Sequence, residues 1–209
     1  MIVFDFIEKM KPFGIFSVSD IEKMYPGLDK RRLFEWQSKG YILKLRNNWY
    51  CLPGFLDDPY STWITANLVH GPSYISLETA LAYHDVISEG VFMTTSVTTN
   101  RPLRLEIHGH TYSYSSLRND IFTGYLLLET SMNNRKVRIA NLEKAIVDFF
   151  YFRTEYATYA SIKELRFSEP VLHEHLDMAR IENYLEAAQN KALADRVRIM
   201  MKIFYHAAS

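Results

Sequence analysis

The sequence contains very little cysteine. Cys51 is the only one among 209 residues, which excludes an intramolecular disulfide and any zinc site built on several thiolates. It lies in the apolar run Trp49-Tyr50-Cys51-Leu52, where a structural role is favoured over nucleophilic catalysis. The cysteine content therefore fits a reducing compartment.

Long apolar runs are also missing. The longest stretches, such as Ala145 to Phe152, are interrupted by charges and fall well short of the roughly 20 residues of a membrane-spanning helix. Near the start, Asp5 and Glu8 occupy positions where a signal peptide needs a basic flank and an uninterrupted apolar core. We therefore expect a cytoplasmic protein without a membrane partner.

The chain has no net charge, with 24 basic and 24 acidic residues. A protein that binds nucleic acid usually carries a basic excess, but here the charges are unevenly distributed. Residues 1–56 contain nine basic and six acidic residues, which leaves 15 basic and 18 acidic residues for 57–209. The positive excess is thus local to the N-terminal quarter.

Catalytic motifs are absent from the sequence. It has neither a glycine-rich phosphate loop nor a Gly-x-Ser-x-Gly elbow, and Glu143 and Asp148 are too far apart in a helical pattern to form a carboxylate pair. His108-Gly109-His110 could direct two imidazoles toward a metal, but a glycine between histidines equally indicates a turn, and no nearby Asp or Cys completes a site. We therefore expect no enzyme, no metal and no cofactor.

The first 40 residues predict three short helices. Apolar residues recur at helical spacing over residues 2–10. A second helix is expected to begin at Ser17 or Ser19, since each precedes an acidic residue by three positions, the spacing of a capping box. The third is expected to take Asp29 as its N-cap and to end at Gly40, a residue suited to the left-handed position after a helix.

The apolar pattern becomes strand-like after Gly40. The runs Tyr41–Leu45 and Trp49–Leu52 flank Asn47-Asn48, and asparagine tolerates the positive φ of a tight hairpin turn. Three helices and a β-wing together predict a winged helix-turn-helix over residues 1–54. Prolines, glycine and two aspartates near residues 54–58 then indicate a domain boundary.

Residues 58–209 predict a second domain of mixed α+β class. Between residues 91 and 128 the sequence is rich in strand-forming side chains with alternating stretches, and these predict an antiparallel sheet. Helices are expected over residues 60–70, 73–84, 142–152 (with Asn141 as N-cap) and 177–204. The fold class is therefore α+β, with the winged helix-turn-helix first and helices at the C-terminal end.

The third helix carries the candidate DNA-binding residues. In a helix-turn-helix this helix enters the major groove while its other face packs on the first two helices. Leu33 and Trp36 form the inner stripe, so basic and polar side chains around them face outward, and the wing adds further candidates. The expected DNA contacts are Lys30, Arg31, Arg32, Phe34, Ser38, Lys44, Arg46, Asn47 and Asn48. The alternatives are a solvated basic helix without a partner and a winged helix used for protein contact.

Four segments of the chain carry a resemblance to a known family: Lys39-Gly40-Tyr41-Ile42, the wing end Trp49-Tyr50, Pro72-Ser73-Tyr74-Ile75-Ser76-Leu77-Glu78-Thr79-Ala80-Leu81, and Ile139-Ala140-Asn141-Leu142-Glu143-Lys144-Ala145-Ile146-Val147-Asp148. Together they resemble the AbiEi-type antitoxin and transcriptional-regulator family of abortive-infection, type IV toxin-antitoxin systems. The resemblance covers nearly the whole chain. It implies an N-terminal domain that represses its own operon by binding promoter DNA, and a C-terminal domain that counteracts a nucleotidyltransferase-type toxin.

The chain departs from the family pattern in the wing. The family commonly has glycine before the final wing tyrosine region, where this chain has Asn47-Asn48-Trp49. Two rival interpretations also remain: a winged-helix protein-interaction adaptor that does not bind DNA, and a metal-dependent enzyme centred on His108 and His110. The two long segments also contain polar residues, which are interpreted as helix caps or as partners of nearby basic residues. They are Ser76, Glu78, Glu143 and Asp148.

Overall fold

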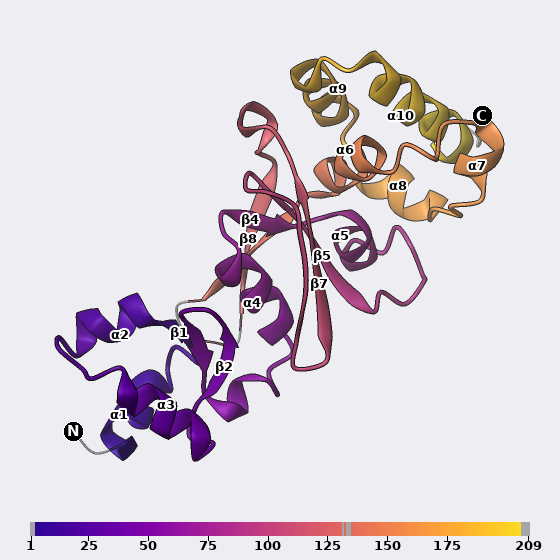
Figure 1. Ribbon diagram of the computed structural model, residues 1–209. Helices are drawn as coiled ribbons and strands as arrows, with labels where there is room; N and C mark the ends of the chain where they lie inside the picture. Colours follow the sequence, from indigo (N-terminus) through magenta and orange to yellow (C-terminus); the bar gives the residue numbers. More distant parts are fainter. Residues whose placement is uncertain (1–2, 131, 133–134, 206–209) are drawn as a thin grey trace.

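The computed structural model describes residues 3–130, 132 and 135–205, and it has the predicted α+β class (Figure 1). Helices of the N-terminal quarter lie at one end of the molecule, the larger sheet lies in the middle, and the C-terminal helices gather at the opposite end. Among all the residues described, no helix is long and apolar enough to cross a membrane.

The three predicted N-terminal helices are α1 (Val3–Met10), α2 (Val18–Met24) and α3 (Arg31–Ser38). The capping box is confirmed at Ser17, whose hydroxyl accepts from the Asp20 N–H while the Asp20 carboxylate accepts from the Ser17 N–H. Asp29 was expected to be the N-cap of α3, but that position is Lys30, one residue later. Asp29 Oδ1 instead accepts from the Arg31 N–H at 2.9 Å, so the carboxylate binds the first turn from just outside the helix.

The predicted hairpin is also confirmed, as β2 (Leu43–Arg46) and β3 (Trp49–Cys51). Asn48 has the positive φ of 65° that the turn requires. The sequence did not predict β1 (Ile15–Ser17), which pairs antiparallel with β3 to give the strand order β1-β3-β2. A strand of three residues between two helices is too short for an alternating pattern to be recognised.

The larger sheet differs from the antiparallel sheet that was expected. It contains β4 (Ser73–Ile75), β5 (Met93–Thr98), β6 (Leu103–Ile107), β7 (His110–Ser116), β8 (Tyr125–Glu129) and β9 (Lys136–Ala140), in the order β6-β7-β5-β4-β9-β8. Two of its pairs, β5 with β7 and β4 with β9, are parallel. The sheet is therefore mixed. The β5–β7 pair is parallel because β6 and β7 form an antiparallel hairpin whose second strand, β7, lies beside β5.

Two strands lie outside the predicted range of residues 91–128. β4 occupies the start of the expected helix over residues 73–84, which begins only with α5 (Leu77–Tyr83). All three residues of β4 are buried, so this strand has no alternation of polar and apolar side chains and cannot be distinguished from a buried helix by period. β9 was missed at the other end, just before the helix α6 (Leu142–Phe152).

The remaining helices lie beside the larger sheet or form the C-terminal end. They are α4 (Ser61–Val69), α6 (Leu142–Phe152), α7 (Tyr159–Lys163), α8 (Glu169–His175), α9 (Met178–Ala188) and α10 (Lys191–Phe204), with short 3₁₀ turns at Pro53–Phe55 and Asn119–Ile121. Asn141 caps α6 as predicted, since its side chain accepts from the Lys144 N–H. α6 packs against α5, α9 and α10, so it connects the sheet to the helical end.

Two hydrophobic clusters form the core, and the small sheet lies between them. Phe16 on one face joins the N-terminal cluster with Phe6 and Trp36. On the other face, Ile15 and Cys51 belong to the large cluster, most of whose members lie in residues 58–209. The predicted boundary near residues 54–58 thus separates two sequence regions whose buried surfaces are continuous.

Gly14 lies where these regions touch, and it supplies a stability prediction. Its φ is +64°, and a Cβ there would lie 2.9 Å from the buried Phe55 ring and 2.7 Å from Met132 Sδ. We expect Gly14→Ala to lose about 1 kcal/mol from the left-handed backbone and about 1–3 kcal/mol more from overpacking. Urea unfolding measures both effects together.

Gly27→Ala is the matched control. Its φ is +77°, but a Cβ there meets no atom within 4 Å, so only the backbone cost of about 1 kcal/mol is expected. Equal unfolding free energies for the two variants would contradict the close approach of Gly14 to Phe55.

Candidate functional site

The outer face of α3 is solvent-exposed, as the periodicity predicts. Leu33 and Trp36 are buried in the N-terminal cluster, whereas the ring of Phe34 is 74% exposed. Lys30, Arg31, Arg32 and Ser38 are exposed as well. The amphipathic helix therefore presents three consecutive basic residues at its N-terminal end and an aromatic ring beside them.

Acidic residues reduce the positive charge of this face. The Arg31 guanidinium lies 3.3 Å from Asp29 Oδ2, and Lys39 Nζ lies 2.6 Å from Glu35 Oε1. The hydrogen bond and charge of Lys39 lower the pKa of Glu35, with a smaller contribution from Arg32. Because Lys39 neutralises Glu35, the local excess of charge on α3 comes from its N-terminal end.

The hairpin follows α3 directly and extends the same surface. Lys44, Asn47 and Asn48 are exposed, and Asn48 adopts a positive φ of 65° in the hairpin turn. These three side chains are available to a partner of the hairpin. Sequence and structure agree on their exposure.

Arg46 lies in a different environment. Its guanidinium is half-buried, donates to the Val69 carbonyl at 3.0 Å and lies 3.4 Å from His70 Nδ1. The side chain therefore attaches the hairpin to the end of α4. Sequence reasoning could not find this contact, because the two partners are 23 residues apart and lie on opposite sides of the predicted boundary.

A second group of polar residues comes from the two long segments that carry the family resemblance. The Asp148 carboxylate accepts hydrogen bonds from Tyr74 Oη and Ser76 Oγ, both at 2.8 Å, and from Lys144 Nζ. Asp148, Lys144, Tyr74 and Ser76 are all buried. Burial raises the pKa of Tyr74 well above its usual value, and the Asp148 charge adds to this shift. The phenol thus remains a protonated donor.

The other polar residues of these segments also have intramolecular partners. Glu143 accepts from the Asp177 N–H at 2.9 Å, ahead of α9, and Glu78 binds Arg153 at 2.6 Å. Glu78, Glu143 and Asp148 thus pair with Arg153, Arg180 and Lys144, as interpreted. Ser76 does not cap α5, and its hydroxyl instead donates to Asp148. With a cavity of about 10 Å³ beside Lys144 and Asp148, the cluster leaves no room for a substrate.

The two histidines proposed as metal ligands have protein partners. His108 lies in the β6–β7 turn with a φ of 47°, and its Nε2–H donates to the Lys44 carbonyl at 3.2 Å. His110 Nε2 lies 2.9 Å from Thr94 Oγ1, and burial lowers the pKa of this imidazole. Among the residues described, no three His, Cys, Asp or Glu side chains form a group that could hold a metal.

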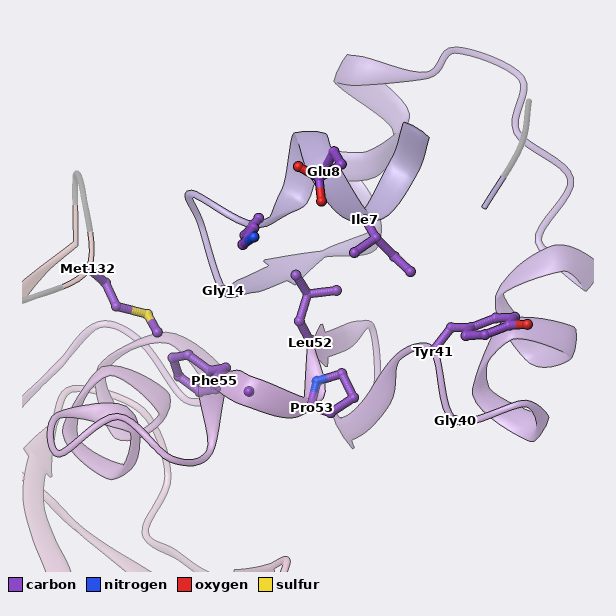
Figure 2. Close-up of a pocket in the computed structure, with 11 residues that line it drawn as sticks. Ile7, Glu8, Gly14, Gly40, Tyr41, Leu52, Pro53, Phe55 and Met132 are labelled. Atoms are coloured by element: carbon purple, nitrogen blue, oxygen red, sulfur yellow. The ribbon is translucent and has the colours of Figure 1, made fainter. Parts of the chain in front are cut away.

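A cavity of about 520 Å³ lies where the N-terminal region meets the rest of the chain (Figure 2). Its walls are mainly apolar and include Ile7, Leu52 and Phe55, with Met132 at one side. Glu8 on α1 and Lys11 just after this helix are the charged residues of the lining. No sequence pattern indicated this cavity, because its walls come from segments far apart along the chain.

A scan of protein-family models gives no match to this chain, and a search of curated proteins finds no significant relative. The function must therefore be argued from the residues themselves.

The Asp148 cluster generates the second prediction. Asp148→Ala leaves the Lys144 ammonium buried without its counterion, and we expect a loss of about 3–5 kcal/mol in the free energy of unfolding. The measurement is urea unfolding followed by circular dichroism.

Asp195→Ala is the control, because the ion pair of Asp195 with Arg198 is exposed and such pairs contribute at most about 1 kcal/mol. A further variant, Lys144→Met with Asp148→Leu, should recover part of the loss, since it removes both buried charges. If Asp148→Ala were as stable as Asp195→Ala, the cluster would not have the structural role assigned to it.

Proposed function

We propose that this chain is a DNA-binding transcriptional regulator whose residues 1–54 form a winged helix-turn-helix. The observation that carries the proposal is the exposed outer face of α3, with Lys30, Arg31 and Arg32 at its N-terminal end. In a helix-turn-helix, the N-terminal residues of the recognition helix contact the base edges in the major groove. The basic end of α3 is therefore the end that would enter the groove of double-stranded DNA.

The other exposed residues fit complementary roles. Phe34 can make apolar contact with a thymine methyl group, and Ser38 can hydrogen-bond a base or a phosphate. In the hairpin, Lys44, Asn47 and Asn48 would bind phosphate oxygens or the adjacent minor groove. Arg46 would support this surface by holding the hairpin on α4 through the Val69 carbonyl.

We further propose that the chain acts in the cytoplasm as the antitoxin of a type IV toxin-antitoxin system. In this role it represses its own operon and counteracts a nucleotidyltransferase-type toxin. The resemblance of both halves of the sequence to the AbiEi-type family supports the proposal. Because the polar residues of the two long segments have intramolecular partners, the antitoxin surface would lie elsewhere on residues 58–209.

A second candidate function is that of a protein-interaction adaptor. It is favoured by one observation, the 74% exposure of Phe34 at the centre of the α3 face, because exposed aromatic rings are enriched at protein interfaces. An electrophoretic shift with the DNA upstream of the gene distinguishes the two functions. The adaptor predicts no shift at low salt.

For DNA binding, we expect Arg31→Ala and Lys44→Ala each to weaken binding to the upstream DNA. Each lost phosphate contact should also reduce the slope of log affinity against log salt by about 0.9. The measurement is fluorescence anisotropy of a labelled duplex over a salt series.

Lys163→Ala is the matched control, since it removes an exposed basic side chain from α7, at the opposite end of the molecule. It should bind like the parent. If both Arg31→Ala and Lys44→Ala also bound like the parent at moderate salt, α3 and the hairpin would not be the DNA-binding surface.

For antitoxin action, we expect the double variant Arg31→Ala, Lys44→Ala to lose DNA binding and to keep protection. The two substitutions lie on the exposed surface of the N-terminal region and touch none of the buried contacts of residues 58–209. Growth of cells that express the toxin measures protection, with the antitoxin produced from an unrelated promoter. A folded double variant that gives no protection would show that neutralisation also requires the DNA-binding surface.

A further inference from the structure

The strand β8 is an unusual edge of the larger sheet. It is the last strand in the order, and β9 is its only neighbour among the residues described. Tyr125, Leu126 and Leu127 are 37%, 50% and 57% exposed. An edge strand that presents consecutive apolar side chains and unpaired backbone groups is a template for another strand.

The opposite edge of the same sheet is protected. In β6, the exposed positions are Arg104 and Glu106, which alternate with partly or fully buried apolar residues. Charged side chains on an edge strand oppose the approach of a second strand. β8 carries a single charge, Glu129, and this carboxylate is already paired with Lys136 on β9 at 2.5 Å.

We propose that β8 pairs antiparallel with β8 of a second copy of this chain, so that the two larger sheets join across a two-fold axis. The pairing is self-complementary when the axis passes beside Leu127. Leu127 then faces its own equivalent, Leu126 faces Leu128, and Tyr125 faces Glu129. This register aligns the whole strand, and each backbone edge is matched to an identical edge.

Side chains on both faces of the sheet support this register. Leu126 is opposite Ile139 and Leu128 is opposite Val137 on β9, so the pairing produces apolar rows that cross the seam from one copy to the other. Such cross-strand apolar pairs stabilise a sheet. On the other face, the two Leu127 side chains meet.

The charges of the strand select the same register. Moving the axis to Glu129 would place two carboxylates opposite each other, which is unfavourable. In the proposed register each Glu129 keeps its own Lys136 and lies opposite Tyr125, so that no two carboxylates meet. The ring of Tyr125 is held by stacking on Tyr74, with centroids 5.5 Å apart. The occupant that fits the edge is therefore a second copy.

Sedimentation equilibrium of the full-length chain over a concentration series tests the proposal. We expect a reversible dimer. Leu127→Lys should raise its dissociation constant by roughly tenfold or more, because two ammonium groups then face each other at the axis. Phe92→Lys is the control, since it removes a side chain that is 92% exposed and lies outside β8, and it should dimerise like the parent.

Introduced cysteines test the register, and they answer even if Leu127→Lys fails to fold. Directly opposed residues bring their Cβ atoms within about 4.5–5.5 Å, close to disulfide geometry. Leu127→Cys should therefore cross-link under mild oxidation, whereas Glu129→Cys should not. The native Cys51 does not interfere, because it is buried and burial raises its pKa to about 12.

Three results would overturn the proposal. They are a monomer at every concentration, a Leu127→Lys variant that dimerises like the parent, and a cross-link through Glu129→Cys without one through Leu127→Cys. A monomer would leave the edge to a strand from a different protein. The outcome is independent of the proposed DNA-binding and antitoxin functions, since none of these readouts involves DNA or a toxin.

Discussion

The rest of this structure depends on the ion pair and hydrogen bonds of the buried Asp148 carboxylate. A carboxylate in an apolar interior is stable only when its charge is paired and its oxygens accept hydrogen bonds. Asp148 meets both conditions through Lys144 on its own helix and through Tyr74 and Ser76 from β4 and the residue that follows it. Because the donors come from separate elements, the charge is satisfied only when α6 lies against β4 in one position.

The position of α6 then determines much of the surrounding structure. Glu143, one turn before Asp148 in the helix, accepts from the backbone ahead of α9, and the Phe150 carbonyl accepts two hydrogen bonds from Arg196 of α10. On the sheet side, β4 lies between the antiparallel β5 and the parallel β9. The Asp148 cluster and these hydrogen bonds together hold the helical end relative to the centre of the sheet.

Local signals in the sequence predicted the elements that depend on local contacts. The capping box at Ser17, the Asn141 cap and the Asn48 turn each involve residues within a few positions of one another, and each was predicted. β4 and the parallel pairs were missed because they depend on partners distant along the chain. The same distinction holds for the candidate site: helical period identified the exposed face of α3, but the contact of Arg46 with Val69 is a tertiary interaction that no local pattern encodes.

The small sheet couples the candidate DNA-binding surface to the rest of the molecule. A unit of about 54 residues buries proportionally little surface and is marginal alone, and here one face of its sheet, with Ile15 and Cys51, is buried in the core of the larger region. Polar contacts reinforce this face, since Arg135 donates to the Ile15 carbonyl and His108 to the Lys44 carbonyl. Because these contacts hold β1 and β2 at their backbones, the exposed side chains of the hairpin keep a fixed orientation relative to the larger sheet. If this surface binds DNA as proposed, such rigidity favours binding by few basic residues, because less conformational entropy is lost on binding.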